Sequence, residues 1–303
     1  MARQTVRDFE IILIDAASPD RTVEVVQSLV PSFPIPLRLE VAPTRISVGA
    51  ARNRGVILSR APLVAFMSAD AEADPRWVER ALRSLETYDI VFGQQLHAPM
   101  IHNVATAVRG LRYHFPEAST TDPLRYASHV NAAFRRRVLE SFPFGEAPGA
   151  SAIDDILLAH RSAEAGFRAA YDPIMIVRHH DIESWRAELT KNRREGLGLG
   201  EFVHELGVQR DVLMWAALLA ATPLLLLVAP WPLALAAFLL VLWAPALRRG
   251  WRRRQHMAGR DVVRGVVASP FFDLAFLFAY LQGLVLGRGH PPKQPGTPDK
   301  VQT

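Results

Sequence analysis

Short apolar runs alternate with stretches of helical periodicity along the N-terminal part of the chain. The apolar runs, at residues 10–14, 37–41, 63–67, 90–92 and 174–177, predict buried strands. The periodic stretches, at residues 18–30, 49–58, 75–85, 100–113, 154–166 and 185–206, predict helices. Within residues 75–85, Trp77, Val78, Ala81, Leu82 and Leu85 share one side of the predicted helix. Strands that alternate with helices imply βαβ units, so we expect an α/β fold with a mostly parallel sheet.

A long apolar region follows this part. Residues 212–247 carry no charged side chain, and as one helix they would measure about 54 Å, against a bilayer core of about 30 Å. Because Pro230 and Pro232 lie midway, we predict a transmembrane hairpin of two helices over residues 208–250. Residues 270–287 predict a third membrane helix within 265–288, with Asp273 near its first turn. The sequence therefore predicts a C-terminal α-helical transmembrane region and a disordered tail at 289–303.

Positive charge is concentrated beside the predicted hairpin. Residues 248–264 hold seven arginines and one aspartate, a local +6, whereas the whole chain carries +5, so the remainder is about −1. We expect a basic loop at 251–264 on the cytoplasmic side of the plasma or inner membrane, with the N-terminal domain, residues 1–207, in the cytoplasm. The N-terminal domain has no basic cluster, so nucleic-acid binding is not expected. The absence of cysteine excludes disulfides and thiolate metal sites.

Carboxylates follow two of the predicted strands. Asp15 comes directly after the strand at 10–14, and Asp70 follows the strand at 63–67. An α/β sheet places its ligand chemistry at the carboxyl ends of its strands. Two such ends side by side can hold a nucleotide and a divalent metal, and carboxylate oxygens suit Mg²⁺ or Mn²⁺. The alternative is that both aspartates only cap turns.

Seven motifs in a fixed order, spanning residues 9–181, resemble glycosyltransferase family 2. They are LIDAASPDRT at 13–22, SVGAARNRG at 47–55, FMSADAEADPRW at 66–77, FGQQ at 92–95, NAAFRR at 131–136, DD at 154–155 and VRHH at 177–180. The resemblance implies a GT-A fold, a Rossmann-like mixed sheet that binds nucleotide-diphospho-sugars. Ser68 stands where the family commonly has the first aspartate of its D-x-D motif, so the third motif is similar to that of rhamnosyltransferase-like members.

The resemblance implies roles for several side chains. Asp15 would hydrogen-bond the nucleotide base at the imide edge of uracil, and Asp70 would hold the Mg²⁺ or Mn²⁺ that bridges the donor diphosphate. Asp155 would be the general base that deprotonates the acceptor hydroxyl in an inverting transfer, oriented by Asp154. Arg52 would contact the diphosphate or pair with Asp15, or it lies on the helix surface. From the residues alone, the acidic pair could equally cap a helix.

The later part of the resemblance leaves alternatives open. His179 or His180 would help bind the metal or the diphosphate, and the sequence does not say which of the two points inward. Glu72 is a weaker candidate metal ligand. Arg193 and Arg194 could contact phosphate or lipid headgroups.

These observations together indicate a membrane-attached, metal-dependent, inverting glycosyltransferase of the hexosyl-transferring class. It would move sugar from a nucleotide-sugar donor to a hydroxyl of a lipid-linked acceptor or a cell-envelope polysaccharide. Relative to the family, the first strand and most of its helix are expected to be missing from the start of the sequence. The alternative is therefore a truncated, non-catalytic pseudoenzyme that acts as a membrane scaffold. A nucleotidyltransferase would carry a Gly-rich loop with a lysine near its N-terminus, which is absent.

Overall fold

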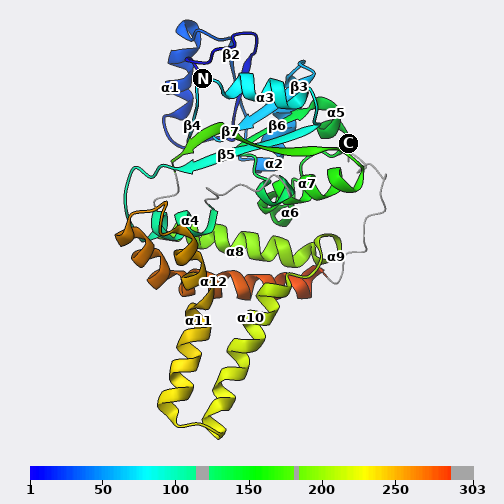
Figure 1. Cartoon of the computed structure of the whole chain (residues 1–303). Coiled ribbons are helices and arrows are strands. Elements are labelled where there is room, and N and C mark those ends of the chain that lie inside the picture. Colours follow the sequence, from blue (N-terminus) through cyan, green and yellow to red (C-terminus); the bar gives the residue numbers. More distant parts are fainter. Residues whose placement is uncertain (114–122, 181–183, 288–303) are drawn as a thin grey trace.

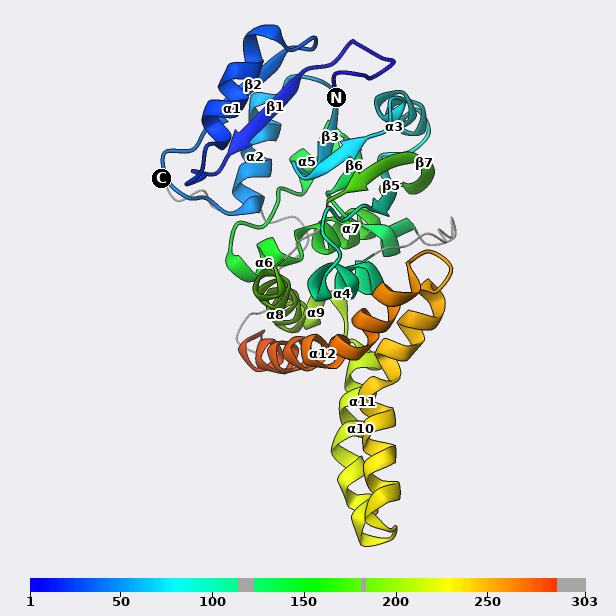
Figure 2. The same cartoon turned by 90° about the vertical axis from the view of Figure 1, so that its left-hand side faces the viewer.

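The computed structural model describes residues 1–113, 123–180 and 184–287, which form three parts in space. A part built on β-sheets lies at one end, two long helices pass beneath it, and a helical hairpin extends away at the other end (Figures 1 and 2). The predicted tail at 289–303 lies outside the described residues.

The helices and strands follow one another in an α/β order up to β7 and are helical after it. The strands are β1 (Ile11–Asp15), β2 (Leu37–Val41), β3 (Leu63–Met67), β4 (Ala71–Ala73), β5 (Ile90–His97), β6 (Asn131–Arg135) and β7 (Ala169–His179). The helices before β7 are α1 (Thr22–Leu29), α2 (Val48–Leu58), α3 (Trp77–Leu85), α4 (Val104–Tyr113), α5 (Arg136–Ser141), α6 (Pro148–Ala152) and α7 (Asp154–Glu164). The helices after it are α8 (Trp185–Glu201), α9 (Val203–Leu206), α10 (Arg210–Ala221), α11 (Trp231–Arg253) and α12 (Gly259–Gly287). Short 3₁₀ helices are η1 (Val30–Ser32), η2 (Pro123–Tyr126) and η3 (Thr222–Leu227).

The strands form two sheets, and the larger one is mixed. β1 and β2 pair in parallel, while a five-stranded sheet has the order β3-β6-β5-β7-β4. In that sheet β5 and β7 are parallel, whereas β3–β6, β5–β6 and β4–β7 are antiparallel. The prediction of a mixed sheet is confirmed, but the expectation of mostly parallel pairing was wrong. Two of the three antiparallel pairs involve β6, which lies between β3 and β5. β6 carries no strand signal, because four of its five residues are buried and the sequence shows no alternation.

The core lies on both faces of the five-stranded sheet. α3 covers one face with Trp77, Val78, Ala81 and Leu85, as its periodicity predicts, but Leu82 is 38% exposed. Phe92 and Phe134 lie in a second cluster with side chains from α2, α5 and α7. The sheet is therefore held between helices, which is the layered arrangement of an α/β domain.

Residues 210–253 form a helical hairpin, which at its base differs from the predicted range 208–250. α10 and η3 form the first limb and α11 the second, with Pro230 at the N-cap of α11. Of the described helices, α11 and α12 are long and apolar enough to cross a membrane. Most of the basic loop predicted at 251–264 is helical, because α11 continues to Arg253 and α12 begins at Gly259. Arginine is a strong helix former, so a run of arginines does not by itself end a helix.

α12 packs along α8 at unusually short range. A Cβ on Gly196 would lie 2.4 Å from the carbonyl oxygen of Phe276, and one on Gly200 would lie 2.2 Å from that of Tyr280. The two backbones therefore touch, as they do where small residues recur at every fourth position of packed helices. In both views α12 runs across the hairpin, not alongside it (Figures 1 and 2).

Candidate functional site

Asp70 and His179 meet where β3 and β7 end. His179 Nε2 lies 3.1 Å from Asp70 Oδ1, and the Ser68 hydroxyl donates to the same oxygen. Burial acts to raise the pKa of Asp70, but the hydrogen bonds from His179 and Ser68 outweigh it and lower the pKa to about 2. Asp70 is therefore ionised at any physiological pH, which is the state that a metal or a cationic partner requires.

The structure distinguishes His179 from His180, a choice that the sequence left open. In β7 the side chain of His179 is buried against Asp70, whereas His180 turns the other way. His180 Nε2 lies 3.1 Å from Glu72 Oε1, and its Nδ1 lies 2.9 Å from the carbonyl oxygen of Ala98. Hydrogen bonding to Glu72, and then to Ala98, raises the pKa of His180. His180 and Glu72 thus form their own pair beside the Asp70–His179 contact.

Asp15 ends β1 as a buried carboxylate in a tight turn. Its Oδ1 accepts the backbone N–H of Ser18 at 2.9 Å, and Ala17 in this turn has a left-handed φ of 62°. Hydrogen bonds from Ser18, the side-chain bond first, lower the pKa of Asp15. This turn delays α1, which begins at Thr22 and not at the predicted residue 18. The turn role of Asp15 is thus present and keeps the carboxylate ionised.

Arg52 contacts Asp154, not Asp15. One Arg52 Nη donates to Asp154 Oδ2, and Asp154 Oδ1 lies 3.5 Å from Nδ1 of the fully buried His129. Burial, followed by the charge of Arg52, lowers the pKa of His129 to about 4, so its ring is neutral. Burial works against the charge of Asp154, but His129 and Arg52 lower its pKa overall. The result is a buried, ionised carboxylate held by one cation.

Asp155, the next residue, has the opposite electrostatics. It lies in the first turn of α7 and accepts the N–H of Ile156 at 3.0 Å. Burial, and then the charge of Asp154, raise the pKa of Asp155 to about 7, while Arg52 opposes the rise and Glu195 of α8 adds to it. A carboxylate that titrates near neutral pH is suited to accept a proton from a substrate.

Residues of the SVGAARNRG motif in α2 hold the loop that leads to Asp154 and Asp155. Asn53 donates to the carbonyl oxygen of Phe144 at 3.0 Å and accepts the N–H of the same residue at 2.8 Å. A Cβ on Gly49 would lie 2.1 Å from the carbonyl oxygen of Gly145, so the position admits only glycine without a shift. Together with Arg52, these residues of α2 fix the loop that precedes α7.

Other motif residues are structural. Asn131 accepts the indole N–H of Trp77 at 2.7 Å and donates to the carbonyl oxygens of Gln94 at 2.9 Å and Met175 at 2.7 Å. Gly93 lies at the irregularity between β5 and β7, where a Cβ would lie 2.3 Å from the Met175 oxygen. The motifs therefore combine fold-determining and chemistry-bearing positions, which the sequence does not distinguish.

Residues of α8 lie near the acidic pair, and sequence reasoning did not assign them to the site. Lys191 Nζ lies 3.4 Å from Glu195 Oε1, and burial, followed by the charge of Arg109, lowers the pKa of Lys191. The charge of Asp155 acts on Lys191, and that of Glu195 acts on Asp155. No sequence signal marked these two residues or His129. Arg193 and Arg194 of the same helix are exposed.

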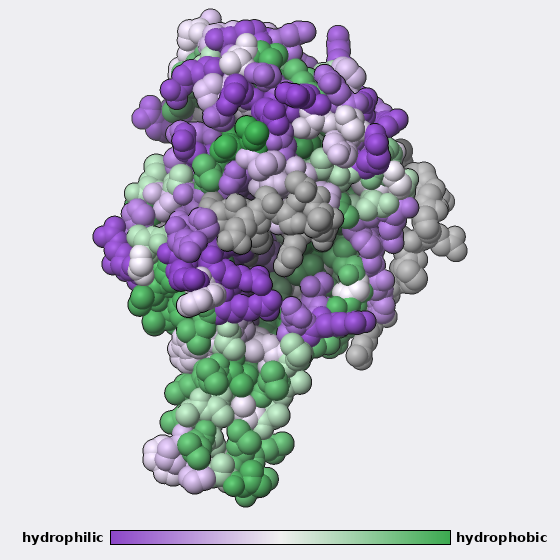
Figure 3. Space-filling view, viewed as in Figure 1, coloured by the Kyte–Doolittle hydropathy of each residue, from purple (hydrophilic) through white to green (hydrophobic). Residues whose placement is uncertain are grey.

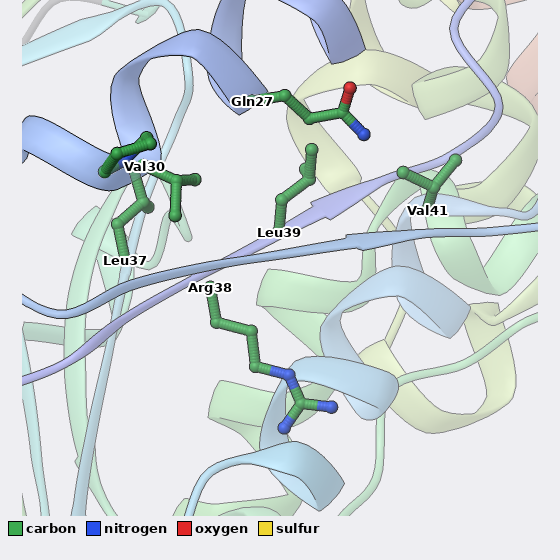
Figure 4. A pocket seen from close by; sticks show the side chains of 7 residues that line it. Gln27, Val30, Leu37, Arg38, Leu39 and Val41 are labelled. Carbon is green, nitrogen blue, oxygen red and sulfur yellow. The ribbon is translucent and has the colours of Figure 1, made fainter.

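The described residues contain no group of three or more histidines or acidic side chains placed to hold a metal ion. A cavity of about 430 Å³ lies elsewhere, between η1, the end of α1 and β2, and no predicted site residue lines it (Figure 4). Leu39 and Val41 point to one side of β2, whereas Arg38 points to the other (Figure 4). The candidate site is therefore defined by Asp70 and by the acidic pair Asp154–Asp155, and not by this cavity.

Comparison with known proteins identifies the fold and the family. Residues 1–142 match the family model described as Glycosyl transferase family 2, which ends before the acidic pair. Among solved structures, the mannosyltransferase PcManGT from Pyrobaculum calidifontis, in complex with GDP-Man and Mn²⁺, aligns at 16% identity with a TM-score of 0.53, over 93% of this chain and 80% of that chain. TarS residues 1–349 from S. aureus, in complex with UDP, align at 14% identity with a TM-score of 0.48, over 93% of this chain and 85% of that chain.

A search of curated proteins by sequence finds no match. The family match nevertheless agrees with the order of the motifs, and the alignment to the mannosyltransferase agrees with the mixed sheet. Residues 1–142 are therefore a glycosyltransferase family 2 domain, and the chain is a glycosyltransferase with a GT-A fold.

Proposed function

We propose that this protein transfers a sugar from a nucleotide-sugar donor to a hydroxyl group of a lipid-linked or envelope-glycan acceptor, with inversion at the anomeric carbon. The observation that carries the proposal is Asp155, a carboxylate at the start of α7 whose pKa is raised to about 7. Two structural neighbours were solved with GDP-Man and with UDP, which supports a nucleotide-linked donor.

The proposed reaction uses the acidic pair as follows. Asp155 takes the proton of the acceptor hydroxyl as the hydroxyl oxygen bonds to the anomeric carbon of the donor sugar. The bond from that carbon to the diphosphate oxygen breaks on the opposite side, and the nucleoside diphosphate leaves. Asp154 keeps its charge through Arg52 and raises the pKa of its neighbour, so Asp155 becomes a stronger base. Asp15 would contact the nucleotide base through its carboxylate, which the bonds from Ser18 keep ionised.

A divalent metal fits the Asp70 group by its chemistry. Asp70 is ionised and His179 lies beside it, so one carboxylate and one imidazole can face the same ion, with diphosphate oxygens completing the ligands. We assign these two residues to Mg²⁺ or Mn²⁺, in preference to His180, which pairs with Glu72. When bound, the ion would offset negative charge on the departing diphosphate.

Membrane attachment would come from the hairpin at residues 208–250. Its surface is apolar over most of its length, whereas polar residues cover much of the sheet part on the face seen in Figure 3. The exposed arginines where α11 ends would face anionic headgroups, which would place the catalytic part on the cytoplasmic side.

A donor panel tests the proposal. Detergent-purified protein with Mn²⁺ or Mg²⁺ is assayed for binding and nucleoside diphosphate release with UDP-, GDP- and dTDP-sugars, alongside Asp70→Ala and Asp155→Asn. We expect one donor to bind in a metal-dependent manner, Asp70→Ala to lose that binding, and Asp155→Asn to keep binding but lose turnover. Binding of no donor by a folded protein would refute the enzyme and favour the membrane scaffold.

A further inference from the structure

α12 is apolar on two opposite sides, and the described residues 1–113, 123–180 and 184–287 cover only one of them. Its covered side packs on α8 and α4, with Phe272 and Tyr280 almost fully buried. On the other side, large apolar side chains that are 37–69% exposed recur at the spacing of one helix face. These residues, the α12 stripe, are Val263, Val267, Phe271, Phe278, Leu281 and Val285. An exposed apolar stripe of this length indicates an apolar partner.

The position of α12 indicates what that partner is. α8 lies between α12 and the sheet part, so the α12 stripe faces the side from which the hairpin extends (Figures 1 and 2). The hairpin itself exposes large apolar residues, among them Leu218, Val228 and Leu240. Exposed basic residues lie between the two apolar surfaces, at the turn from α11 into α12, among them Arg252, Arg254 and Arg260. A bilayer that surrounds the hairpin would therefore reach the α12 stripe at its surface.

The packing of α8 argues against α12 as a membrane-crossing helix. The contact runs from Gly196 against Phe276 to Glu201 against Gly287, where a Cβ on Gly287 would lie 2.4 Å from the Glu201 oxygen. α8 carries charged residues at both ends of this contact: the exposed Arg193 and Arg194 come just before it, and Glu201 ends it. If α12 crossed the bilayer, α8 would enter the hydrocarbon with it, and charged side chains at the bilayer centre are costly.

We propose that α12 lies in the plane of the bilayer surface, with the α12 stripe in the headgroup–acyl boundary, and that only the hairpin crosses. The inference rests on the membrane attachment proposed above. Charge complementarity supports a leaflet with anionic lipids, because exposed arginines flank the stripe at its start, including Arg260 and Arg264. Trp251, 68% exposed beside them, is a residue type enriched at bilayer interfaces.

This arrangement would place the acidic pair close to the leaflet. Packed helices lie about 8–10 Å apart, so α8 would lie one such spacing above α12. Glu195 of α8 is near enough to Asp155 to raise its pKa. The acceptor hydroxyl would therefore be reached close to the headgroups, which suits an acceptor anchored in lipid.

Depth measurements with single labels test the orientation. The chain has no cysteine, so Phe271→Cys, Phe278→Cys and Val285→Cys each accept one spin label without a background thiol. The labelled full-length protein is placed in vesicles of phosphatidylcholine and phosphatidylglycerol, and depth is measured from the relative accessibility to oxygen and to an aqueous nickel chelate. Leu218→Cys and Val228→Cys on the hairpin serve as references. Only variants whose unfolding temperature equals that of the wild type are compared.

An in-plane helix predicts one shared shallow depth for the three α12 labels, about 5–10 Å into the boundary. A crossing helix would instead separate Phe271 from Val285 by about 21 Å of depth, at 1.5 Å per residue. That separation, or labels on α12 in water while the hairpin labels are embedded, would overturn the α12 proposal alone. Hairpin labels in water as well would overturn the membrane attachment itself.

Discussion

Replacing Asp155 with asparagine is expected to remove sugar transfer while stabilising the fold at alkaline pH. The pKa of Asp155 is raised from 3.8 to about 7, so the folded protein holds a proton that the unfolded chain has lost. Between about pH 4 and pH 7 the free energy of unfolding therefore falls as pH rises. The contribution of the protonated Asp155 is complete only below that window. Asparagine is neutral at every pH and escapes this loss.

The size of the effect follows from the shift. A rise of about three pKa units corresponds to roughly 4 kcal/mol at pH 8, at 1.36 kcal/mol per unit. This is an upper limit, because part of the Asp155 side chain reaches solvent. At about 2–4 °C per kcal/mol for a domain of this size, a gain of several degrees in unfolding temperature is expected for Asp155→Asn at pH 8. At pH 4 the two proteins should unfold at similar temperatures.

Thermal unfolding in detergent at pH 4, 6 and 8 measures the difference, with Asp154→Asn as the matched control. The fold lowers the pKa of Asp154, so Asp154→Asn should lower the unfolding temperature at pH 8 instead of raising it. It would leave Arg52 without this carboxylate, and breaking a buried pair costs about 3–5 kcal/mol. An Asp155→Asn protein no more stable than wild type at pH 8 would refute the raised pKa, and retained transfer would refute its role as the base.

Three further substitutions test other parts of the structure. His179→Ala removes the hydrogen bond to Asp70 and should raise the Mn²⁺ concentration for half-maximal donor binding by about tenfold or more, so an unchanged metal titration would contradict the assigned ligands. Gly200→Ala should lower the free energy of unfolding by about 1–3 kcal/mol through overpacking, despite the better helix propensity of alanine. Gly259→Ala, where a Cβ meets nothing within 4 Å, should not lower it. Asn53→Ala loses hydrogen bonds worth about 1 kcal/mol each and should reduce both stability and turnover; full activity would show that the loop before α7 does not depend on them.

Local pattern was enough to place most strands and helices. β2 and β3 have the bounds that their apolar runs predict, because turn-forming residues limit both runs. The same pattern missed β6, since a strand buried on both faces shows no alternation, and with it the antiparallel pairing of the sheet. α3 illustrates the limit within one helix, because its periodicity includes Leu82 although the sheet covers only the other four positions.

Pairings between distant residues lay beyond the sequence. The sequence offers Asp15 as a carboxylate partner for Arg52, but Arg52 contacts Asp154, which lies 102 residues away along the chain; its contact with the diphosphate stays a prediction. His129, which lies against the same carboxylate, carries no signal because a single histidine is most often a core residue. The choice between His179 and His180 depends on strand register, since neighbouring residues of a strand point to opposite faces.

The sequence by itself determined the order of most of the elements, the carboxylates that follow β1 and β3, and the apolar C-terminal region, because each depends on residues adjacent in the chain. Only the tertiary structure decided that Asp155 titrates near pH 7 while Asp154 stays ionised, since burial and charges from α2 and α8 act on them differently. It also decided the direction of α12. Hydropathy measures how apolar a helix is, whereas the contact of its backbone with α8, at Gly196 and Gly200, sets where it points.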